Sequence, residues 1–252
     1  MGEIVRRHDP DRFFTALFAP AERREALFTL YAFNHELARA REMAREPMMA
    51  LIRLQWWREV VEGARRRHEV AGPLGAVLDA GMLLPADLLG MLEGREMEAE
   101  PLGTLAAWRS YVLAAAGGVA VAAGHALGGP PGLGPALRAY GAAYGVSGLL
   151  RSVAALARQG RSVFPEEMLP GGADAQGPPW SAAARAARGT LAWEAHGWLA
   201  EARQTAIPRC VLAAALPAAF AGADLRRLDR DSGLRSPWRR GWVLAASLRG
   251  SI

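Results

Sequence analysis

The chain has 252 residues, and its single cysteine, Cys210, excludes an internal disulfide and a cysteine-rich zinc or iron–sulfur site. The net charge of +5 comes from arginine alone, because the sequence contains no lysine. The arginines are spread along the chain without a nucleic-acid-binding motif. We therefore expect anionic small molecules, lipid surfaces or proteins as partners, and no nucleic acid.

Helical periodicity runs through the whole chain, and no stretch shows the period-two alternation of a strand. The apolar spacing predicts helices at residues 9–20, 21–42, 46–69, 84–100, 104–127, 134–158, 181–204 and 209–222. A long loop rich in glycine and proline separates the sixth helix from the seventh. We read this loop as a connection inside one domain, so we predict an all-α protein with a single domain over residues 1–252.

The least polar stretch, residues 110–137, is long enough to be considered as a membrane span. Its high alanine and glycine content, and its interruption by His125, Pro130 and Pro131, favour a buried helix followed by a loop. The glycines in AAAGGVAVAAG, residues 114–124, lack the spacing of a phosphate-binding loop or of a dinucleotide site. They indicate close packing between helices.

The stretch LYAFNHELARARE, residues 30–42, predicts a helix with one buried face. Asn34, Ala38 and Glu42 follow one another four residues apart on or beside that face. Polar groups next to a buried face are either partnered or functional. This stretch is therefore the first candidate for a site.

Several separated blocks of the chain occur in an order and spacing that resembles the squalene/phytoene synthase family. They are residues 13–33, LQWWREVVEG (54–63), LPADLLGMLEGREMEA (84–99), YVLAAAGGV (111–119) and residues 141–165. The resemblance covers about residues 10–170, and C-terminal helices and an Arg/Trp-rich tail follow at 181–252. It implies an all-α prenyl-synthase fold, with helices around a central cavity.

The resemblance also locates two acidic motifs. Active members of the family join prenyl diphosphates with Mg²⁺ that carboxylates hold. The first motif falls on Ala38, Arg39 and Glu42, and the second falls on Ser152 and Leu156. Only Glu42 keeps a carboxylate, so we expect that metal-dependent ionisation is lost, that there is no catalytic residue, and that no metal or other cofactor is bound.

Two arginines, Arg151 and Arg161, match family arginines that face the diphosphate end of the cavity. They predict either anion binding without a metal or internal salt bridges, for example to Glu42 or Glu98. We expect Glu42 itself to partner an arginine rather than Mg²⁺. His35 stands where the family has a further arginine.

The segments AFNHELA, IRLQWWREVVE and GVSGLLRS resemble one branch of the family, which comprises a mitochondrial complex I assembly factor and its alphaproteobacterial relatives. This resemblance implies a pseudoenzyme that acts in assembly of respiratory complex I, the NADH:quinone oxidoreductase. Its partners would be complex I subunits or assembly proteins. The implied location is the bacterial cytoplasm, with peripheral contact to the inner face of the inner membrane.

Two other functions stay open. A divergent prenyl transferase would bind Mg²⁺ through carboxylates from elsewhere, such as Glu36, Glu96 or Glu98. A non-catalytic isoprenoid- or quinone-binding protein would have a long apolar pocket, open at the end that carries Arg151 and Arg161.

The C-terminal segment, residues 223–252, mixes arginine with tryptophan. The residues concerned are Arg226, Arg227, Arg230, Arg235, Arg239, Arg240, Trp238 and Trp242. This composition suits a helix end whose tryptophans dock into the core. It also suits contact with an anionic membrane surface.

Overall fold

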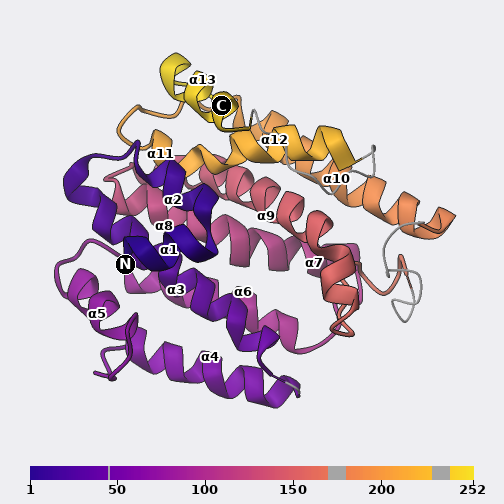
Figure 1. Cartoon of the computed structure of the whole chain (residues 1–252), viewed down its shortest axis with the longest axis horizontal. Helices are drawn as coiled ribbons and strands as arrows, with labels where there is room; N and C mark the ends of the chain where they lie inside the picture. Colours follow the sequence, from indigo (N-terminus) through magenta and orange to yellow (C-terminus); the bar gives the residue numbers. More distant parts are fainter. Residues whose placement is uncertain (45, 170–179, 229–238) are drawn as a thin grey trace.

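Figure 1 shows the computed structural model of the chain, which describes residues 1–44, 46–169, 180–228 and 239–252. The helices are α1 (Gly2–His8), α2 (Pro10–Ala16), α3 (Arg24–Glu42), α4 (Pro47–Val61), α5 (Ala71–Asp79), α6 (Pro85–Glu96), α7 (Leu105–Val112), α8 (Gly118–Ala126), α9 (Gly134–Ala157), α10 (Ala182–Ala202), α11 (Leu212–Ala215), α12 (Pro217–Leu228) and α13 (Arg239–Arg249). No strand occurs within these described ranges, so the all-α prediction is confirmed.

The helix that runs from Leu105 to Ala126 lies in the middle of the fold. A π-helical turn, Leu113–Gly117, joins α7 to α8 in this helix. It is long and apolar enough to cross a membrane by length and composition, but 56% of its most apolar window is buried inside the protein. Since α8 packs against α3, α6 and α9, the apolar sequence is that of a core helix, as predicted.

The 24-residue helix α9 packs along this central helix, and α10 and α12 cover α9 (Figure 1). Gly141 makes the contact close, because a Cβ there would lie 2.7 Å from the Ala116 carbonyl oxygen and 2.8 Å from the Ala120 Cβ. On the other side, a Cβ at Gly94 of α6 would lie 2.6 Å from the Ala115 nitrogen. Glycines therefore set the distance between these three helices. Of the glycines that the sequence predicted to pack closely, Gly117 does so, because a Cβ there would lie 2.7 Å from the Arg138 carbonyl oxygen of α9.

Several of the predicted helix boundaries are wrong, and three helices, α1, α5 and α13, lie outside the predicted ranges. The helix predicted at 46–69 ends at Val61, because Gly63 adopts a φ of 112°, which an α-helix cannot continue. Helix α12 runs on to Leu228 instead of ending at 222. Helix α5 was not predicted, since AGPLGAVLD contains two glycines and a proline; its packing against α3 and α4 stabilises it.

The Arg/Trp-rich C-terminus also differs from the prediction. Trp242 is 50% exposed on α13, so the expected docking of this tryptophan into the core is wrong. Arg239, on the same helix, is buried instead. Arg230, Arg235 and Trp238 lie outside the described residues.

The close approach of α9 to the central helix yields a stability prediction. We expect Gly141→Ala to lower the free energy of unfolding by about 2 kcal/mol, because the added methyl group overpacks a contact made by backbone. Gly90→Ala is the matched control, since Gly90 is also helical but a Cβ added there would meet no atom within 4 Å. That variant should gain about 0.5 kcal/mol from helix propensity. Urea unfolding measures both, and equal effects of the two substitutions would contradict close packing at Gly141.

Candidate functional site

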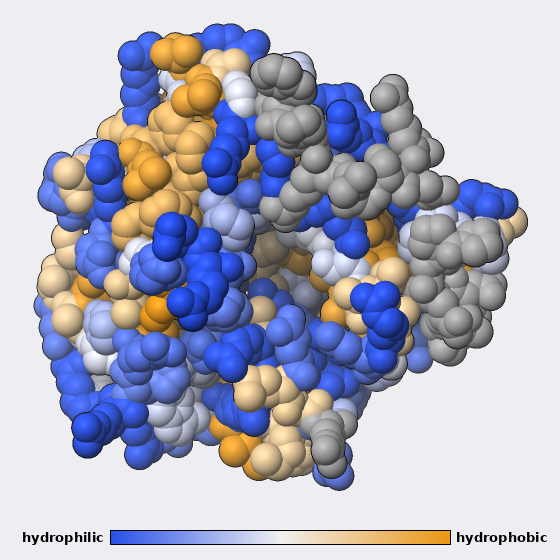
Figure 2. All heavy atoms as spheres, viewed as in Figure 1, coloured by the Kyte–Doolittle hydropathy of each residue, from blue (hydrophilic) through white to orange (hydrophobic). Residues whose placement is uncertain are grey.

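A cleft of about 340 Å³ opens between α3, α6, the central helix and α9. Figure 2 shows this view of the molecule hollowed near its centre, with hydrophilic residues bordering the hollow. Helix α3 turns its apolar residues Leu30, Phe33 and Leu37 into the core, which leaves Asn34 and Ala38 at the edge of the cleft.

Four of the five predicted motif positions meet in this cleft. Ala38 and Glu42 line it from α3, and Ser152 and Leu156 line it from α9. Arg39 does not line it; the Arg39 side chain pairs with Glu36 on the same helix at 3.1 Å. The cleft therefore has methyl, hydroxyl and alkyl groups at three of the four positions.

Glu42 does not behave as predicted. It is exposed, and it makes no ion pair with any residue that the structure describes. The carboxylate that does bind arginine is Glu98, in the 3-10 turn Met97–Ala99 that follows α6. Sequence reasoning gave this position a secondary role.

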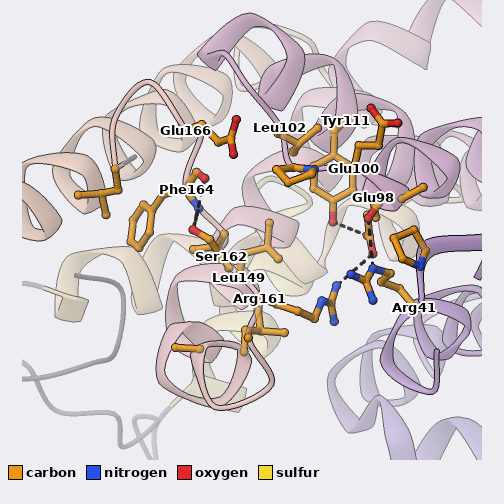
Figure 3. Close-up of a pocket in the computed structure, with 18 residues that line it drawn as sticks. Arg41, Glu98, Glu100, Leu102, Tyr111, Leu149, Arg161, Ser162, Phe164 and Glu166 are labelled. Atoms are coloured by element: carbon orange, nitrogen blue, oxygen red, sulfur yellow. Dashed lines mark hydrogen bonds and ion pairs between the residues drawn. The ribbon is translucent and has the colours of Figure 1, made fainter. Parts of the chain in front are cut away.

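Glu98 is the centre of a partly buried hydrogen-bond cluster (Figure 3). Its carboxylate accepts hydrogen bonds from Arg95 at 2.6 Å, from the Tyr111 hydroxyl at 2.6 Å and from Arg161 at 3.2 Å. Arg41 of α3 donates to the Glu98 backbone carbonyl at 3.3 Å. Of its two predicted roles, Arg161 thus takes that of an internal salt bridge.

Within this cluster, the Tyr111 hydroxyl keeps its proton. Burial raises the pKa of Tyr111, and the negative charge of Glu98 raises it further, so the phenol stays protonated and donates to the carboxylate. Arg95 also donates to the Asn34 side-chain oxygen at 3.5 Å. The polar edge of LYAFNHELARARE is therefore partnered at Asn34.

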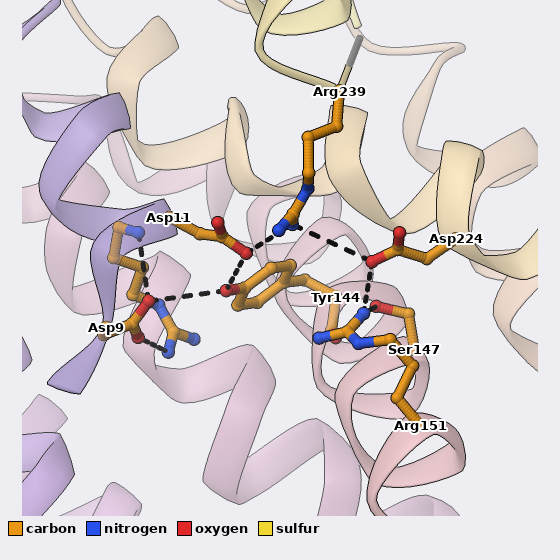
Figure 4. Close-up of polar contacts among 8 residues, drawn as sticks. Asp9, Asp11, Tyr144, Ser147, Arg151, Asp224 and Arg239 are labelled. Carbon is orange, nitrogen blue, oxygen red and sulfur yellow. Dashed lines mark hydrogen bonds and ion pairs between the residues drawn. The ribbon is translucent and has the colours of Figure 1, made fainter. Parts of the chain in front are cut away.

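The other predicted arginine, Arg151, belongs to a second buried network (Figure 4). It pairs with Asp224 of α12 and not with Glu42 or Glu98. Arg239, at the start of α13, pairs with Asp11 at 2.5 Å and lies 3.9 Å from Asp224.

The same network reaches the N-terminal helices. The Tyr144 hydroxyl lies 3.3 Å from Asp11 and 3.4 Å from Asp9, and Arg12 pairs with Asp9 at 2.9 Å. Burial raises the pKa of Tyr144 well above its ordinary value, with Asp9 adding to the effect. Sequence reasoning missed this network, because Asp11 and Arg239 are 228 residues apart and no local pattern relates them.

The donor set of the cleft does not suit Mg²⁺. Its described lining includes four arginines (Arg12, Arg95, Arg151 and Arg161) but only two carboxylates, Glu42 and Glu98. Mg²⁺ requires several oxygen ligands, and both Glu98 oxygens already accept hydrogen bonds from cationic or phenolic donors. Within the described ranges, no group of three or more His, Cys, Asp or Glu side chains could hold a metal ion.

A second cavity of about 550 Å³ adjoins the cleft. The two share Glu98, Tyr111, Leu149, Leu156 and Arg161, so the Glu98–Arg161 ion pair stands at their common wall. The second cavity adds apolar side chains from the chain after α9, including Phe164 (Figure 3).

Solved structures define the class of this fold. The chain superposes on the crystal structure of a dehydrosqualene synthase in complex with ligand with a TM-score of 0.81, over 98% of this chain and 94% of that one, at 17% identity. It superposes on squalene synthase HpnC from Alicyclobacillus acidocaldarius with a TM-score of 0.73, over 90% and 91%, at 18% identity. The fold is the all-α isoprenoid synthase fold, as predicted.

Sequence comparison then gives the family. The profile of the squalene/phytoene synthase family matches residues 5–244, so this chain belongs to that family. The match extends well beyond the predicted range of 10–170 and reaches into α13.

Relatives among curated proteins share a shorter segment. The human protein "NADH dehydrogenase (ubiquinone) complex I, assembly factor 6" is 38% identical over 60 residues, and the Bos taurus protein of the same name is 37% identical over 60 residues. These residues are 24% of this chain and 18% of each relative, so the chain spans less than a fifth of the curated relatives it matches.

The partly buried carboxylate yields a prediction for Glu98→Gln. We expect a loss of about 3 kcal/mol in unfolding free energy, because the neutral amide leaves Arg95 and Arg161 without a counter-charge. Glu96→Gln is the matched control: Glu96 pairs with Arg58 at 2.7 Å, but these side chains are 33% and 22% exposed. It should cost less than about 1 kcal/mol. Equal losses in urea unfolding would contradict the role assigned to Glu98.

The position of His35 yields a pH prediction. Its ring stacks on His8 with centroids 4.1 Å apart, and burial, followed by His8, lowers the pKa of His35 below its ordinary value of 6.5. The unfolded chain therefore binds a proton more readily, and stability should fall as the pH drops through 6.5. We expect His35→Gln to lose less stability than the wild type between pH 7 and 5.5, with exposed His196→Gln as the control. Parallel pH curves for the wild type and His35→Gln would refute this.

Proposed function

We propose that this protein is a pseudoenzyme of the squalene/phytoene synthase family that acts in the assembly of respiratory complex I. The observation that carries the proposal is the chemistry of the cleft. Ala38, Ser152 and Leu156 line it at positions where the family resemblance expects metal-binding carboxylates. The partly buried Glu98 is bound by arginine and tyrosine instead.

A divergent prenyl transferase is less well supported. It would draw on Glu36, Glu96 or Glu98 to hold Mg²⁺ against a diphosphate leaving group. Glu36 is paired with Arg39, Glu96 with Arg58, and Glu98 with two arginines. Among these three carboxylates, only Glu98 lines the cleft, and its oxygens are already engaged.

Similarity to the complex I assembly factor supports the second half of the proposal. Complex I subunits or other assembly proteins are the partners it implies, and the cytoplasm, at the inner face of the membrane, is the location it implies. Because the 60 matched residues are a small part of the human protein, the role in assembly needs a direct test in cells.

Non-catalytic binding of an isoprenoid or quinone is a second candidate function. The adjoining cavities of about 340 and 550 Å³ support it, because they share the apolar side chains of Leu149 and Leu156. Mass spectrometry of lipids that copurify with the protein tests it, and a purified protein free of any prenyl lipid would count against it.

Deletion of the gene in its host tests the leading proposal. We expect native gels to show less assembled complex I and membranes to show less NADH:quinone oxidoreductase activity. The wild-type gene should restore both. Glu42→Gln should restore both as fully, because a non-catalytic protein does not depend on the one carboxylate kept at the metal motifs.

Each result can contradict one half of the proposal. An unchanged amount of complex I after deletion would contradict the role in assembly. Failure of Glu42→Gln to restore complex I, at a protein level equal to the wild type, would contradict the pseudoenzyme claim. The exposed position of Glu42 makes a folding defect in this variant unexpected.

A further inference from the structure

Helix α13 has an apolar face that the rest of the described chain leaves uncovered. The helix packs onto the protein through Arg239, Val243 and Ala246, which are buried. On the opposite side, Leu248 is 78% exposed, and Leu244, one turn before it, is 48% exposed. Figure 2 shows hydrophobic residues with hydrophilic neighbours at the top of the molecule, where Figure 1 places α13.

The charged side chains of α13 itself all have one sign. Residues 239–252 contain no aspartate or glutamate. Arg240 and Arg249 are exposed and lie near the two ends of the helix. Arg226 adds a further guanidinium, 5.8 Å from the centre of the Trp242 ring, and exposed Arg209 lies beside Gly250.

Two acidic residues of the described chain lie within ion-pair distance of α13, and both are buried. They are Asp11 and Asp224, which lie near Arg239 on the inner side of α13. That network holds the first turn of the helix against α2 and α12. Arg239 therefore anchors the helix on its inner side, whereas Arg240 and Arg249 are exposed. The Arg240 guanidinium lies 5.5 Å from the centre of the Phe14 ring.

We infer that α13 is a docking helix for an anionic lipid bilayer. In this arrangement Leu244 and Leu248 enter the acyl boundary and Trp242 lies at the headgroup level, where tryptophan is favoured. Arg240 and Arg249 contact the lipid phosphates. Every exposed charge on α13 is positive. The headgroup plane of an anionic leaflet is uniformly negative, so these arginines favour a bilayer over a protein groove.

The contribution of the two leucines is tested with the purified 252-residue chain and sedimented vesicles. Phosphatidylcholine vesicles with added phosphatidylglycerol should bind the wild type at low salt, and vesicles of phosphatidylcholine alone should bind it much less. The Leu244→Ser/Leu248→Ser variant should bind about tenfold less tightly. Met48→Ser/Ile52→Ser is the matched control, since these residues are 62% and 55% exposed and also four apart, but on α4.

The contribution of the α13 arginines to vesicle binding is tested with a second double variant and its control. Arg240→Gln/Arg249→Gln should weaken binding to the anionic vesicles by about thirtyfold, since each surface arginine contributes about 1 kcal/mol. Arg7→Gln/Arg67→Gln removes the same charge from two exposed positions outside α13 and should bind like the wild type. Thermal unfolding verifies that all variants fold.

Three outcomes would overturn the inference: no wild-type binding to anionic vesicles at low salt, equal binding to neutral vesicles, or equal losses in the α13 and control variants. Retention of the protein by an acidic protein partner without any vesicle binding would assign the face to a protein instead. Because the assay uses vesicles and purified protein, its result is independent of the role in complex I assembly.

Discussion

The carboxylate of Glu98 joins the parts of the chain that meet at the cleft. It binds Arg95 of α6, Tyr111 of α7 and Arg161 beyond the end of α9, and its own backbone carbonyl binds Arg41 of α3. Two arginine side chains near one another in a partly buried space require a counter-charge, and Glu98 supplies it. This one residue thus links four segments of the chain and lines both cavities.

The same interaction constrains the chemistry that the cleft can perform. A carboxylate whose oxygens accept three hydrogen bonds has little capacity left for a metal ion, and a neighbouring excess of arginine opposes a second cation. Helix α9 repeats the pattern on the far side of the cleft, where Arg151 is held by Asp224. Arg95, Arg151 and Arg161, which line the cleft, are thus paired with carboxylates of the chain, and the fold remains while metal-dependent ionisation is proposed to be lost.

The sequence predicted the long helices correctly. It did not predict α5 or the ion pairs between residues far apart in the chain. Helices such as α9 carry apolar residues at helical spacing over many turns, which makes them predictable. Helix α5 has no such pattern over many turns and was not predicted, because it forms through packing against α3 and α4. At the site, the resemblance brought Ala38 and Leu156 together correctly, but the partners of Arg151 and Arg239 lie in helices remote in sequence, and periodicity contains no information about them.

The central claim is that the cleft performs no metal-dependent ionisation of a prenyl diphosphate. Incubation of the purified protein with farnesyl diphosphate and Mg²⁺, followed by measurement of released diphosphate, tests it most directly. We expect release no faster than in a protein-free sample, with an active squalene synthase as the positive control. Release that requires Mg²⁺ and is abolished by Glu42→Gln would contradict it.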